Sequence, residues 1–259
     1  MSAELVRARV AERLAKFRMR TVAERLDSIL SDAARSEPTY LDFLDRLLTE
    51  EAEEKQRKRV TMGITIAQFP TVKTLDDFDF KFQPSVDHKL MRELATGRFV
   101  ANAENVLLFG PPGVGKTHLA IALGRAVVES GHSVLFVSAT SMLAALTQAQ
   151  RDGRLAEQIT FYTKAKLLIV DELGYLPLEH ATANHFFQLV NRRYEKGSML
   201  ITTNQTVTQW GHVFGDDTIA AAVLDRLLHH SHTLLIKGES YRLREKKKAG
   251  LINSEKPKH

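Results

Sequence analysis

The sequence predicts an α/β protein in which helices flank a parallel β-sheet, preceded by a small all-helical domain. Three observations indicate this fold class. From about residue 87 onward, short apolar runs alternate with longer segments that carry apolar residues at helical spacing. The short runs are apolar almost throughout, as expected for strands buried on both faces of a parallel sheet. Residues 1 to about 60 show helical spacing throughout.

The first expected domain, residues 1–66, begins with the helical segment "LVRARVAERLAKFRMRTVAERLDSIL". A further helix follows in "SEPTYLDFLDRLLTEEAEEKQRKRV", with Ser36 as its expected cap and Pro38 near its first turn. Its charges change from "EEAEE" to "KQRKR", an order that favours pairing between residues four apart and suits the helix dipole. The basic stretch is therefore either a solvated helix face or a ridge that binds DNA or a partner.

Residues 67–86 interrupt the helical pattern with prolines and phenylalanines, which predicts a linker that packs on the next domain. The sheet is expected in residues 87–245. Its predicted strands are "ENVLLFG", "SVLFVSA", "AKLLIVDEL", "SMLITTN" and "HTLLIKG". Its predicted helices are "THLAIALGRAVVESG", "SMLAALTQAQRDGRLAEQITFYTK" with a break at Gly153, "NHFFQLVNRRYEKG" and "DDTIAAAVLDRLLHHS". The basic residues 246–259 are expected to form a disordered tail.

The composition excludes several classes of protein. The chain has 259 residues, 44% of them apolar, which can supply a hydrophobic core. It has no cysteine, which excludes disulfides and cysteine-based metal sites. No segment approaches the roughly 18 apolar residues of a membrane helix, so the sequence predicts a cytoplasmic protein without a membrane partner. The formal net charge of +5 is compatible with a polyanionic partner.

The segment "GPPGVGKT" fits the phosphate-binding pattern G-x-x-x-x-G-K-[ST] without a mismatch, between a predicted strand and a predicted helix. Its glycines let backbone N–H groups point at phosphate oxygens, and the helix adds its positive end. Lys116 should reach the terminal phosphates of ATP, and the Thr117 hydroxyl should bind Mg²⁺. The residues expected to hold the nucleotide are Gly110, Pro111, Pro112, Gly113, Val114, Gly115, Lys116, Thr117 and His118.

Two adjacent acids follow the apolar strand in "LLIVDEL". Asp171 is expected to hold Mg²⁺ together with Thr117, and Glu172 to polarise the attacking water. A pair of acids, rather than a lone aspartate, favours hydrolysis over nucleotide binding alone. The strand "LITTN" also ends in polar residues, and Asn204 is the candidate that contacts the attacking water or the γ-phosphate.

The motifs "GPPGVGKTHLA", "LLIVDELG", "LITTN", "VLDRLLH" and "GESYRLR" together resemble the AAA+ P-loop ATPases of the helicase-loader and initiator branch, which includes DnaC and DnaA. Within that branch the chain is most similar to the IstB family, the ATP-dependent helpers of insertion-sequence transposition. The linker "AQFPTVKTLDDFDF" resembles the segment that precedes the IstB ATPase domain. The resemblance covers nearly the whole chain, and the order of the later motifs is more specific than the phosphate loop.

The resemblance implies roles for two arginines. Arg226 in "VLDRL" corresponds to the arginine finger, which reaches the γ-phosphate held by a neighbouring subunit. Arg242 in "SYR" corresponds to the position that touches the phosphates within its own subunit. The resemblance therefore implies a homo-oligomer with ATP at its subunit interfaces. It also implies assembly on DNA and a transposase of the IstA type as partner in choosing the target DNA.

In this branch an additional helical element lies between the second strand and the acidic strand, and here it corresponds to "SMLAALTQAQRDGRLAEQITFYTKAK". Its cations at Arg151, Arg154, Lys164 and Lys166 either contact DNA phosphates or belong to a solvated loop. Basic and aromatic residues do not interleave there, so binding to double-stranded DNA should be largely independent of sequence.

Other functions remain open. A DnaC-type helicase loader would share the ATPase domain and differ in its N-terminal domain and partner. A small-molecule P-loop kinase and a DNA-binding module with a vestigial nucleotide site are disfavoured by the intact Lys116, Asp171 and Glu172. The clustered His229, His230 and His232 have no cysteine or acid at ligand spacing, which favours a structural or interfacial role over a zinc site.

Overall fold

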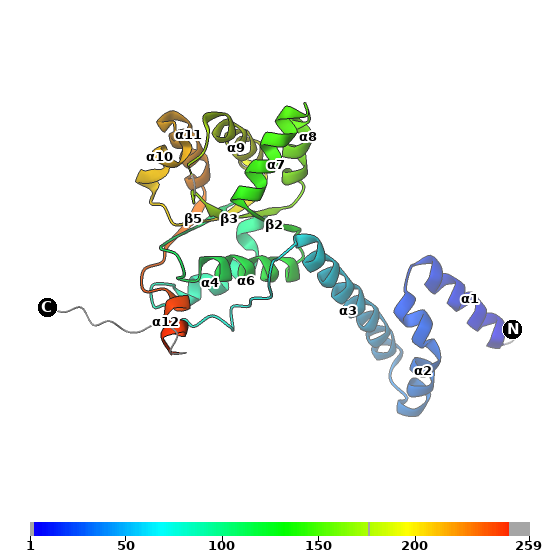
Figure 1. The fold of residues 1–259 in the computed structure, drawn as a ribbon. Helices are drawn as coiled ribbons and strands as arrows, with labels where there is room; N and C mark the ends of the chain where they lie inside the picture. Colours follow the sequence, from blue (N-terminus) through cyan, green and yellow to red (C-terminus); the bar gives the residue numbers. More distant parts are fainter. Residues whose placement is uncertain (1–2, 176, 249–259) are drawn as a thin grey trace. The chain divides into compact units, whose positions relative to one another are not determined.

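The computed structural model describes residues 3–175 and 177–248 and divides into two compact units (Figure 1). The first unit comprises residues 1–62, and the second begins at Gly63. Of the tail predicted at 246–259, residues 249–259 lie outside the described residues. Within the described ranges, no helix is long and apolar enough to cross a membrane.

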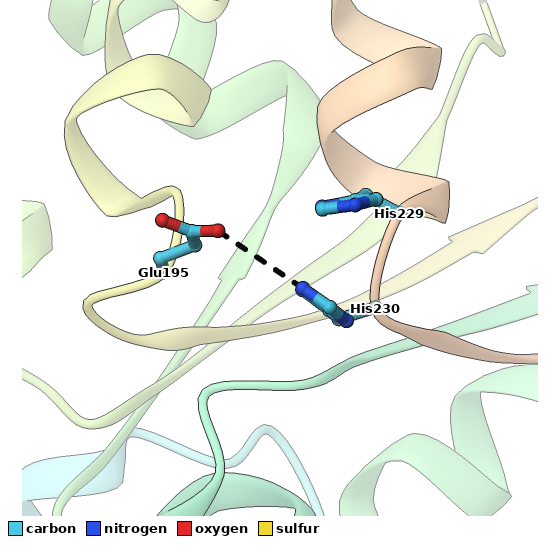
Figure 2. Close-up of side chains that lie close together, drawn as sticks. All are labelled: Glu195, His229 and His230. Carbon is cyan, nitrogen blue, oxygen red and sulfur yellow. Dashed lines mark ion pairs between the residues drawn. The ribbon is translucent and has the colours of Figure 1, made fainter.

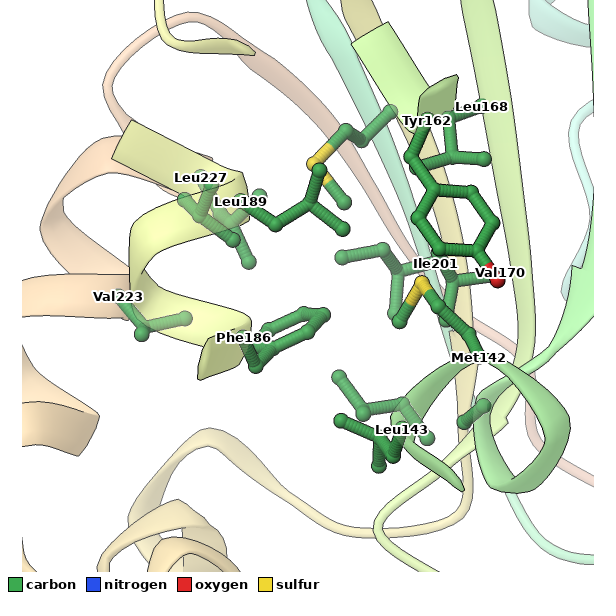
Figure 3. Close-up of a cluster of buried hydrophobic side chains, with 14 of the residues drawn as sticks. Met142, Leu143, Tyr162, Leu168, Val170, Phe186, Leu189, Ile201, Val223 and Leu227 are labelled. Carbon is green, nitrogen blue, oxygen red and sulfur yellow. The ribbon is translucent and has the colours of Figure 1, made fainter. Parts of the chain in front are cut away.

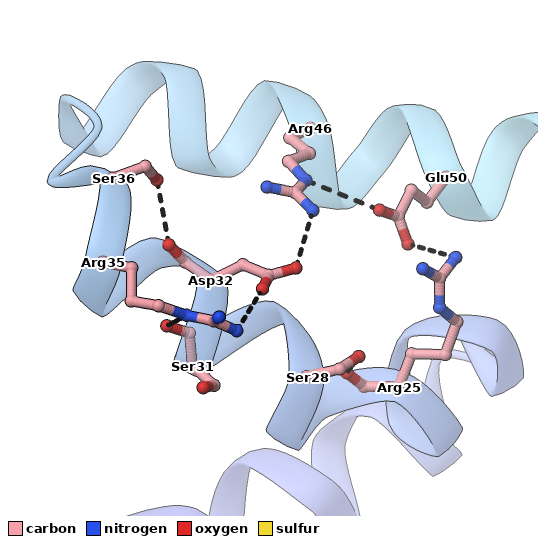
Figure 4. A network of polar contacts seen from close by, with 8 residues as sticks. All are labelled: Arg25, Ser28, Ser31, Asp32, Arg35, Ser36, Arg46 and Glu50. Atoms are coloured by element: carbon pink, nitrogen blue, oxygen red, sulfur yellow. Dashed lines mark hydrogen bonds and ion pairs between the residues drawn. The ribbon is translucent and has the colours of Figure 1, made fainter.

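The N-terminal unit contains only helices, as the apolar spacing predicts. They are α1 (Ala3–Lys16), α2 (Arg20–Ser36) and α3 (Tyr40–Ala67). Residues 63–67 of α3 belong to the second unit. The small core of the N-terminal unit is formed by Leu14, Val22, Leu26 and Ile29. Helices α2 and α3 are also joined by Arg46, which binds Asp32 at 3.2 Å (Figure 4).

The cap predicted at Ser36 is wrong. Ser36 is the last residue of α2, and its hydroxyl donates a hydrogen bond to the carbonyl of Asp32 at 2.9 Å. The hydroxyl of Thr39 instead accepts the backbone N–H of Asp42 at 3.2 Å, directly before the first residue of α3. Both residues can cap a helix, and the position of Thr39 next to the first turn decides between them.

The second unit is built on a five-stranded parallel sheet with the order β2-β3-β4-β1-β5, which confirms the predicted fold class. Its strands are β1 (Asn105–Phe109), β2 (Val134–Ser138), β3 (Leu167–Leu173), β4 (Ser198–Thr203) and β5 (Ser231–Leu235). Every residue of the central strands β1 and β4 is buried, whereas β5 lies at an edge and is partly exposed. Because the strands are parallel, β1, β3 and β4 end at the same edge of the sheet.

Helices cover both faces of this sheet (Figure 1). One face carries α4 (His88–Ala95) and α6 (Lys116–Glu129), with the short α5 (Arg98–Ala101) between α4 and β1 in the chain. The other face carries α7 (Ala139–Arg151), α8 (Leu155–Thr163), α9 (His180–Arg193), α10 (Trp210–Phe214) and α11 (Asp217–Leu228). The predicted break at Gly153 is confirmed, because this glycine separates α7 from α8 with a φ of 69°.

The main apolar core lies between the sheet and the helices of the second face (Figure 3). Met142 of α7, Phe186 of α9, Leu227 of α11 and Ile201 of β4 all contribute to it, and all are almost fully buried. Helices distant in the sequence are therefore packed into one layer. This layer fixes where α9 and α11 lie relative to the ends of the strands.

A buried arginine, Arg193, connects the ends of several helices and strands by hydrogen bonds. The guanidinium of Arg193 donates to the carbonyls of Tyr162, Ala165, Lys166 and Ser198 at 2.7 to 3.0 Å. Burial lowers the pKa of Arg193 to about 10, so the side chain stays protonated at neutral pH. The ends of α8, α9, β3 and β4 are thereby held in place by hydrogen bonds to backbone carbonyls, and no carboxylate of the described residues forms an ion pair with Arg193.

Candidate functional site

The predicted phosphate loop lies between β1 and α6, where the chain turns from a buried strand into a helix. Gly113 and Gly115 adopt φ values of 83° and 100°, a region that other residues rarely occupy. A Cβ atom on Gly115 would lie only 2.6 Å from the ring of Phe78, and one on Gly113 would collide with Ser240. Glycine is therefore required at both positions for two reasons, the backbone conformation and the close packing around the loop.

Lys116 is the first residue of α6 and is buried within this loop. Its Nζ donates to the carbonyl oxygens of Gly110 and Pro111 at 2.7 and 2.8 Å. Burial lowers the pKa of Lys116, and the carboxylates of Asp171 and Glu172 partly offset this effect. The ammonium group of Lys116 is thus hydrogen-bonded to carbonyl oxygens of the loop itself. It lies beside the backbone N–H groups that are expected to bind phosphate.

The acids of β3 are joined to the loop by hydrogen bonds. The hydroxyl of Thr117 lies 3.0 Å from each carboxylate oxygen of Asp171. From the neighbouring strand β4, the buried hydroxyl of Thr202 donates to Asp171 at 2.6 Å and accepts the backbone N–H of Glu172 at 2.8 Å. Thr202 therefore positions both acids, a role that the sequence analysis missed although "LITTN" contains this residue.

The backbone changes direction at the second acid. Glu172 has a φ of 61°, and the register between β3 and β4 shifts between Val170 and Leu173. The shift leaves Asp171 buried and the side chain of Glu172 exposed. Two adjacent carboxylates thereby have different surroundings, one among hydroxyl groups and the other at the wall of a cavity.

These residues border a cavity of about 630 Å³. It brings together most of the predicted nucleotide-site residues, namely Pro112, Gly113, Val114, Gly115, Lys116, Thr117, His118, Glu172, Asn204 and Arg242. Gly110 and Pro111 contribute carbonyls beneath the loop. Arg242 enters through α12 (Tyr241–Lys248), whose first backbone N–H donates to the carbonyl of Gly113 at 3.0 Å.

Another wall of the cavity comes from the linker before α4, whose residues are not among the predicted site residues. Phe78, Phe82 and Gln83 line it, and the edge of the Phe78 ring packs against His118 at a centroid distance of 5.3 Å. Nε2 of His118 is hydrogen-bonded to the carbonyl of Thr74 at 2.8 Å. The signal for this wall was the run of phenylalanines in "LDDFDFKF", which pack beside the phosphate loop.

Arg226 lies on a different surface from the residues that line the nucleotide cavity. Among the residues that the structure describes, it is not one that lines the cavity. Its guanidinium donates to Asn191 at 3.1 Å and to the carbonyl of Ala222 at 2.9 Å, and it lies 5.0 Å from the centre of the Phe187 ring. Its position on the border of the apolar face of α11 follows from the buried Val223 and Leu227 beside it.

The four cations expected to contact DNA are all exposed, but they do not form one cluster. Arg151 and Arg154 flank the bend at Gly153, where Arg154 pairs with Asp152 at 3.0 Å. Lys164 and Lys166 follow the other end of α8, a helix of nine residues and hence about 14 Å long. The two pairs therefore present separate positive charges near the two ends of α8.

Comparison with known proteins identifies the family of the chain. The model of the family described as IstB-like ATP binding protein matches residues 12–249. The chain is 48% identical over 239 residues to the insertion sequence IS21 ATP-binding protein of Pseudomonas aeruginosa, covering 92% of this chain and 90% of that protein. It is 40% identical to the insertion sequence IS5376 ATP-binding protein of Geobacillus stearothermophilus, covering 93% and 96% of the two chains.

Solved structures show the same fold at lower identity. AMPPCP-bound DnaA from Aquifex aeolicus matches with a TM-score of 0.55 and 21% identity, over 74% of this chain and 58% of that chain. DnaI matches with a TM-score of 0.51 and 22% identity, over 65% of this chain and 89% of that chain. The second unit thus has the AAA+ fold of the initiator and helicase-loader proteins.

Proposed function

Because this chain belongs to the family of IstB-like ATP-binding proteins, we propose that it is a cytoplasmic ATPase that assembles on DNA and assists a transposase. The observation that carries the hydrolytic part is the hydrogen-bonded series from Thr117 through Asp171 to Thr202, which ends at the N–H of Glu172. It places two acids beside a phosphate loop, as nucleotide hydrolysis requires.

Within the cavity, the amides of the phosphate loop and Lys116 bind the phosphates of ATP, exchanging the carbonyl contacts of Lys116 for phosphate oxygens. The hydroxyl of Thr117 and the carboxylate of Asp171 are hard oxygen donors and fit Mg²⁺, which neutralises phosphate charge when bound. Glu172 accepts a proton from the attacking water, and Asn204 orients that water or the γ-phosphate. Arg242 adds positive charge at the mouth of the loop.

Arg226 completes the site of a neighbouring copy of this chain. It lies outside the cavity of its own chain, and its partners Asn191, Ala222 and Phe187 are all neutral. Its positive charge is therefore not balanced by an ion pair among the described residues. A guanidinium of this kind stabilises the charge that develops on a transferred phosphoryl group. Hydrolysis then depends on a homo-oligomer with ATP between subunits.

Double-stranded DNA is the proposed polyanionic partner, bound largely without regard to sequence. The exposed pairs Arg151/Arg154 and Lys164/Lys166 provide phosphate contacts at both ends of α8. Binding of this kind weakens steeply with salt because condensed counterions are released. The protein partner is a transposase of the IstA type, since the relatives at 48% and 40% identity are ATP-binding proteins of insertion sequences.

The alternative is a helicase loader of the DnaC type, which the fold of the second unit alone does not separate from the transposition helper. The test uses the full chain with ATP, Mg²⁺ and a linear duplex. We expect phosphate release, duplex-dependent oligomers and retention on the immobilised transposase encoded with the same insertion sequence. Retention on the replicative helicase instead would support the loader, and no phosphate release with or without the duplex would contradict the ATPase.

A further inference from the structure

Three exposed side chains with metal-binding chemistry meet at one place outside the nucleotide site (Figure 2). Glu195 follows α9 in the turn to β4, His229 caps the end of α11, and His230 comes next in the chain. One ligand atom from each lies within 4.8 Å of the others. No acid lies at ligand spacing in the sequence, but the fold brings Glu195 next to the two histidines from more than thirty positions upstream.

The separation of these atoms is close to that of a metal site. Nε2 of His230 lies 4.0 Å from Oε1 of Glu195. Two ligands that are each about 2.1 Å from a tetrahedral zinc ion are about 3.4 Å apart, so the side chains need to approach by roughly 1 Å. All three side chains are exposed, which leaves room for this approach by rotation about their side-chain bonds.

The surrounding chain orients the ring of one ligand and holds the backbone of another in an uncommon conformation. The hydroxyl of Tyr194 is hydrogen-bonded to Nδ1 of His229 at 2.8 Å, and the two rings are stacked with an interplanar angle of 30°. A histidine that engages one nitrogen in a hydrogen bond is thereby oriented to offer the other to a metal. Glu195 itself has a φ of 56°, a left-handed conformation that a glycine or asparagine would adopt at lower cost.

We propose that Glu195, His229 and His230 bind one divalent transition-metal ion of the zinc class, with a fourth position open to water or to a neighbouring molecule. Two imidazoles and a carboxylate favour zinc over magnesium, which prefers oxygen ligands alone. The ion would connect the turn after α9 to the end of α11, three residues beyond Arg226. It would therefore stabilise the helix end that carries the proposed finger.

The test is a calorimetric titration of the metal-free full chain with Zn²⁺ in buffer that contains excess Mg²⁺, which competes for the oxygen ligands at Thr117 and Asp171. We expect one zinc ion per chain. The substitutions His229→Ala, His230→Ala and Glu195→Gln should each weaken zinc binding at least about tenfold. Tyr194→Phe should also weaken it by about tenfold, because it removes the hydroxyl that orients His229. His212→Ala, which removes another exposed histidine, is the control and should bind zinc as the unchanged chain does.

Two further readouts separate a lost ligand from a misfolded variant. Zinc should raise the Tm of the unchanged chain and of His212→Ala but not that of the ligand variants, whose Tm without metal should stay near that of the unchanged chain. Co²⁺ should give visible absorption bands of a four- or five-coordinate ion that disappear in the ligand variants. Equal zinc affinity in the unchanged chain and all three ligand variants would overturn the proposal.

Discussion

Nε of Arg226 on α11 donates a hydrogen bond to Oδ1 of Asn191 on α9 at 3.1 Å, so the guanidinium is held against its own chain. The ring of Phe187, which lies on α9 like Asn191, also packs against this guanidinium. For Arg226 to reach a phosphate in a neighbouring subunit, it must exchange these neutral contacts for the phosphate. Such contacts contribute about 1 kcal/mol each, which a charge-assisted bond to phosphate can exceed.

Arg226→Ala should leave ATP binding unchanged, because every residue that lines the nucleotide cavity is retained. Hydrolysis should fall by about 10³-fold or more, the usual contribution of an arginine finger. Fluorescent-nucleotide binding and steady-state phosphate release measure the two effects. Arg92→Ala, which removes an exposed arginine on α4, should leave both unchanged.

Mixing two inactive variants tests whether the arginine acts between chains. Lys116→Ala lacks a working phosphate loop but keeps Arg226, whereas Arg226→Ala keeps the loop and lacks the finger. Co-assembly on DNA should restore part of the phosphate release. At some interfaces the intact phosphate loop of an Arg226→Ala chain then meets the intact Arg226 of a Lys116→Ala chain. A mixture that stays as inactive as its components would contradict action in trans.

Thr202→Val should impair catalysis more than nucleotide binding. The substitution leaves the N–H of Glu172 without its acceptor and removes the 2.6 Å hydrogen bond to Asp171. We expect a loss of about 1–3 kcal/mol in the free energy of unfolding and about a 10- to 100-fold decrease in kcat. Urea denaturation and phosphate release measure these two quantities.

Thr203→Val is the matched control for this prediction. Thr203 is the next buried threonine of β4, and its hydroxyl accepts the N–H of Gln205 rather than contacting an acid. We expect it to lose stability while keeping most of its turnover. Thr202→Ser should restore both, since serine keeps the hydroxyl. Equal loss of kcat in both valine variants would show that Thr202 has no specific positioning role.

Glu172→Gln should retain nucleotide and lose turnover. The side chain of Glu172 is exposed to the cavity, so the amide fits the same space and only the charge and basicity change. Loss of a general base lowers kcat by about 10²- to 10⁴-fold. Single-turnover phosphate release measures the step directly, and Glu93→Gln on α4 provides a control at an exposed glutamate. Normal turnover in Glu172→Gln would exclude it as the base.

The sequence predicts the sheet and the loop of this site well because both depend on local patterns. The apolar runs and the glycine spacing specify β1, the phosphate loop and α6 without knowledge of the rest of the chain. The location of Asp171 next to Thr117 also follows, since parallel strands end at one edge. Predicting these elements requires only the periodicity of apolar residues and the turn that glycine permits.

Contacts between strands and between distant turns are less accessible from the sequence. Thr202 binds Asp171 only because β3 and β4 are neighbours with a register shift, which no local pattern indicates. Phe78 lines the nucleotide cavity because the linker folds back on the phosphate loop. Glu195 meets His229 through the packing of α9 against α11. Each of these relationships depends on tertiary packing rather than on residue spacing.

His118 should make the stability of the chain depend on pH. Burial lowers its pKa below the usual 6.5, and Nε2 of its ring is hydrogen-bonded to the carbonyl of Thr74. As the pH falls through 6.5, the unfolded chain binds a proton at this residue and the folded chain does not. The free energy of unfolding therefore decreases with falling pH and stops changing, for this group, below the folded pKa.

Urea denaturation between pH 8 and pH 5 measures this dependence. His118→Gln should flatten the curve below pH 6.5, because glutamine can donate to the same carbonyl without titrating. His185, whose pKa is also lowered by burial, should leave a residual slope in that variant. The double substitution with His185→Gln should reduce that slope further. Identical curves for the unchanged chain and His118→Gln would mean that His118 titrates alike in the folded and unfolded states.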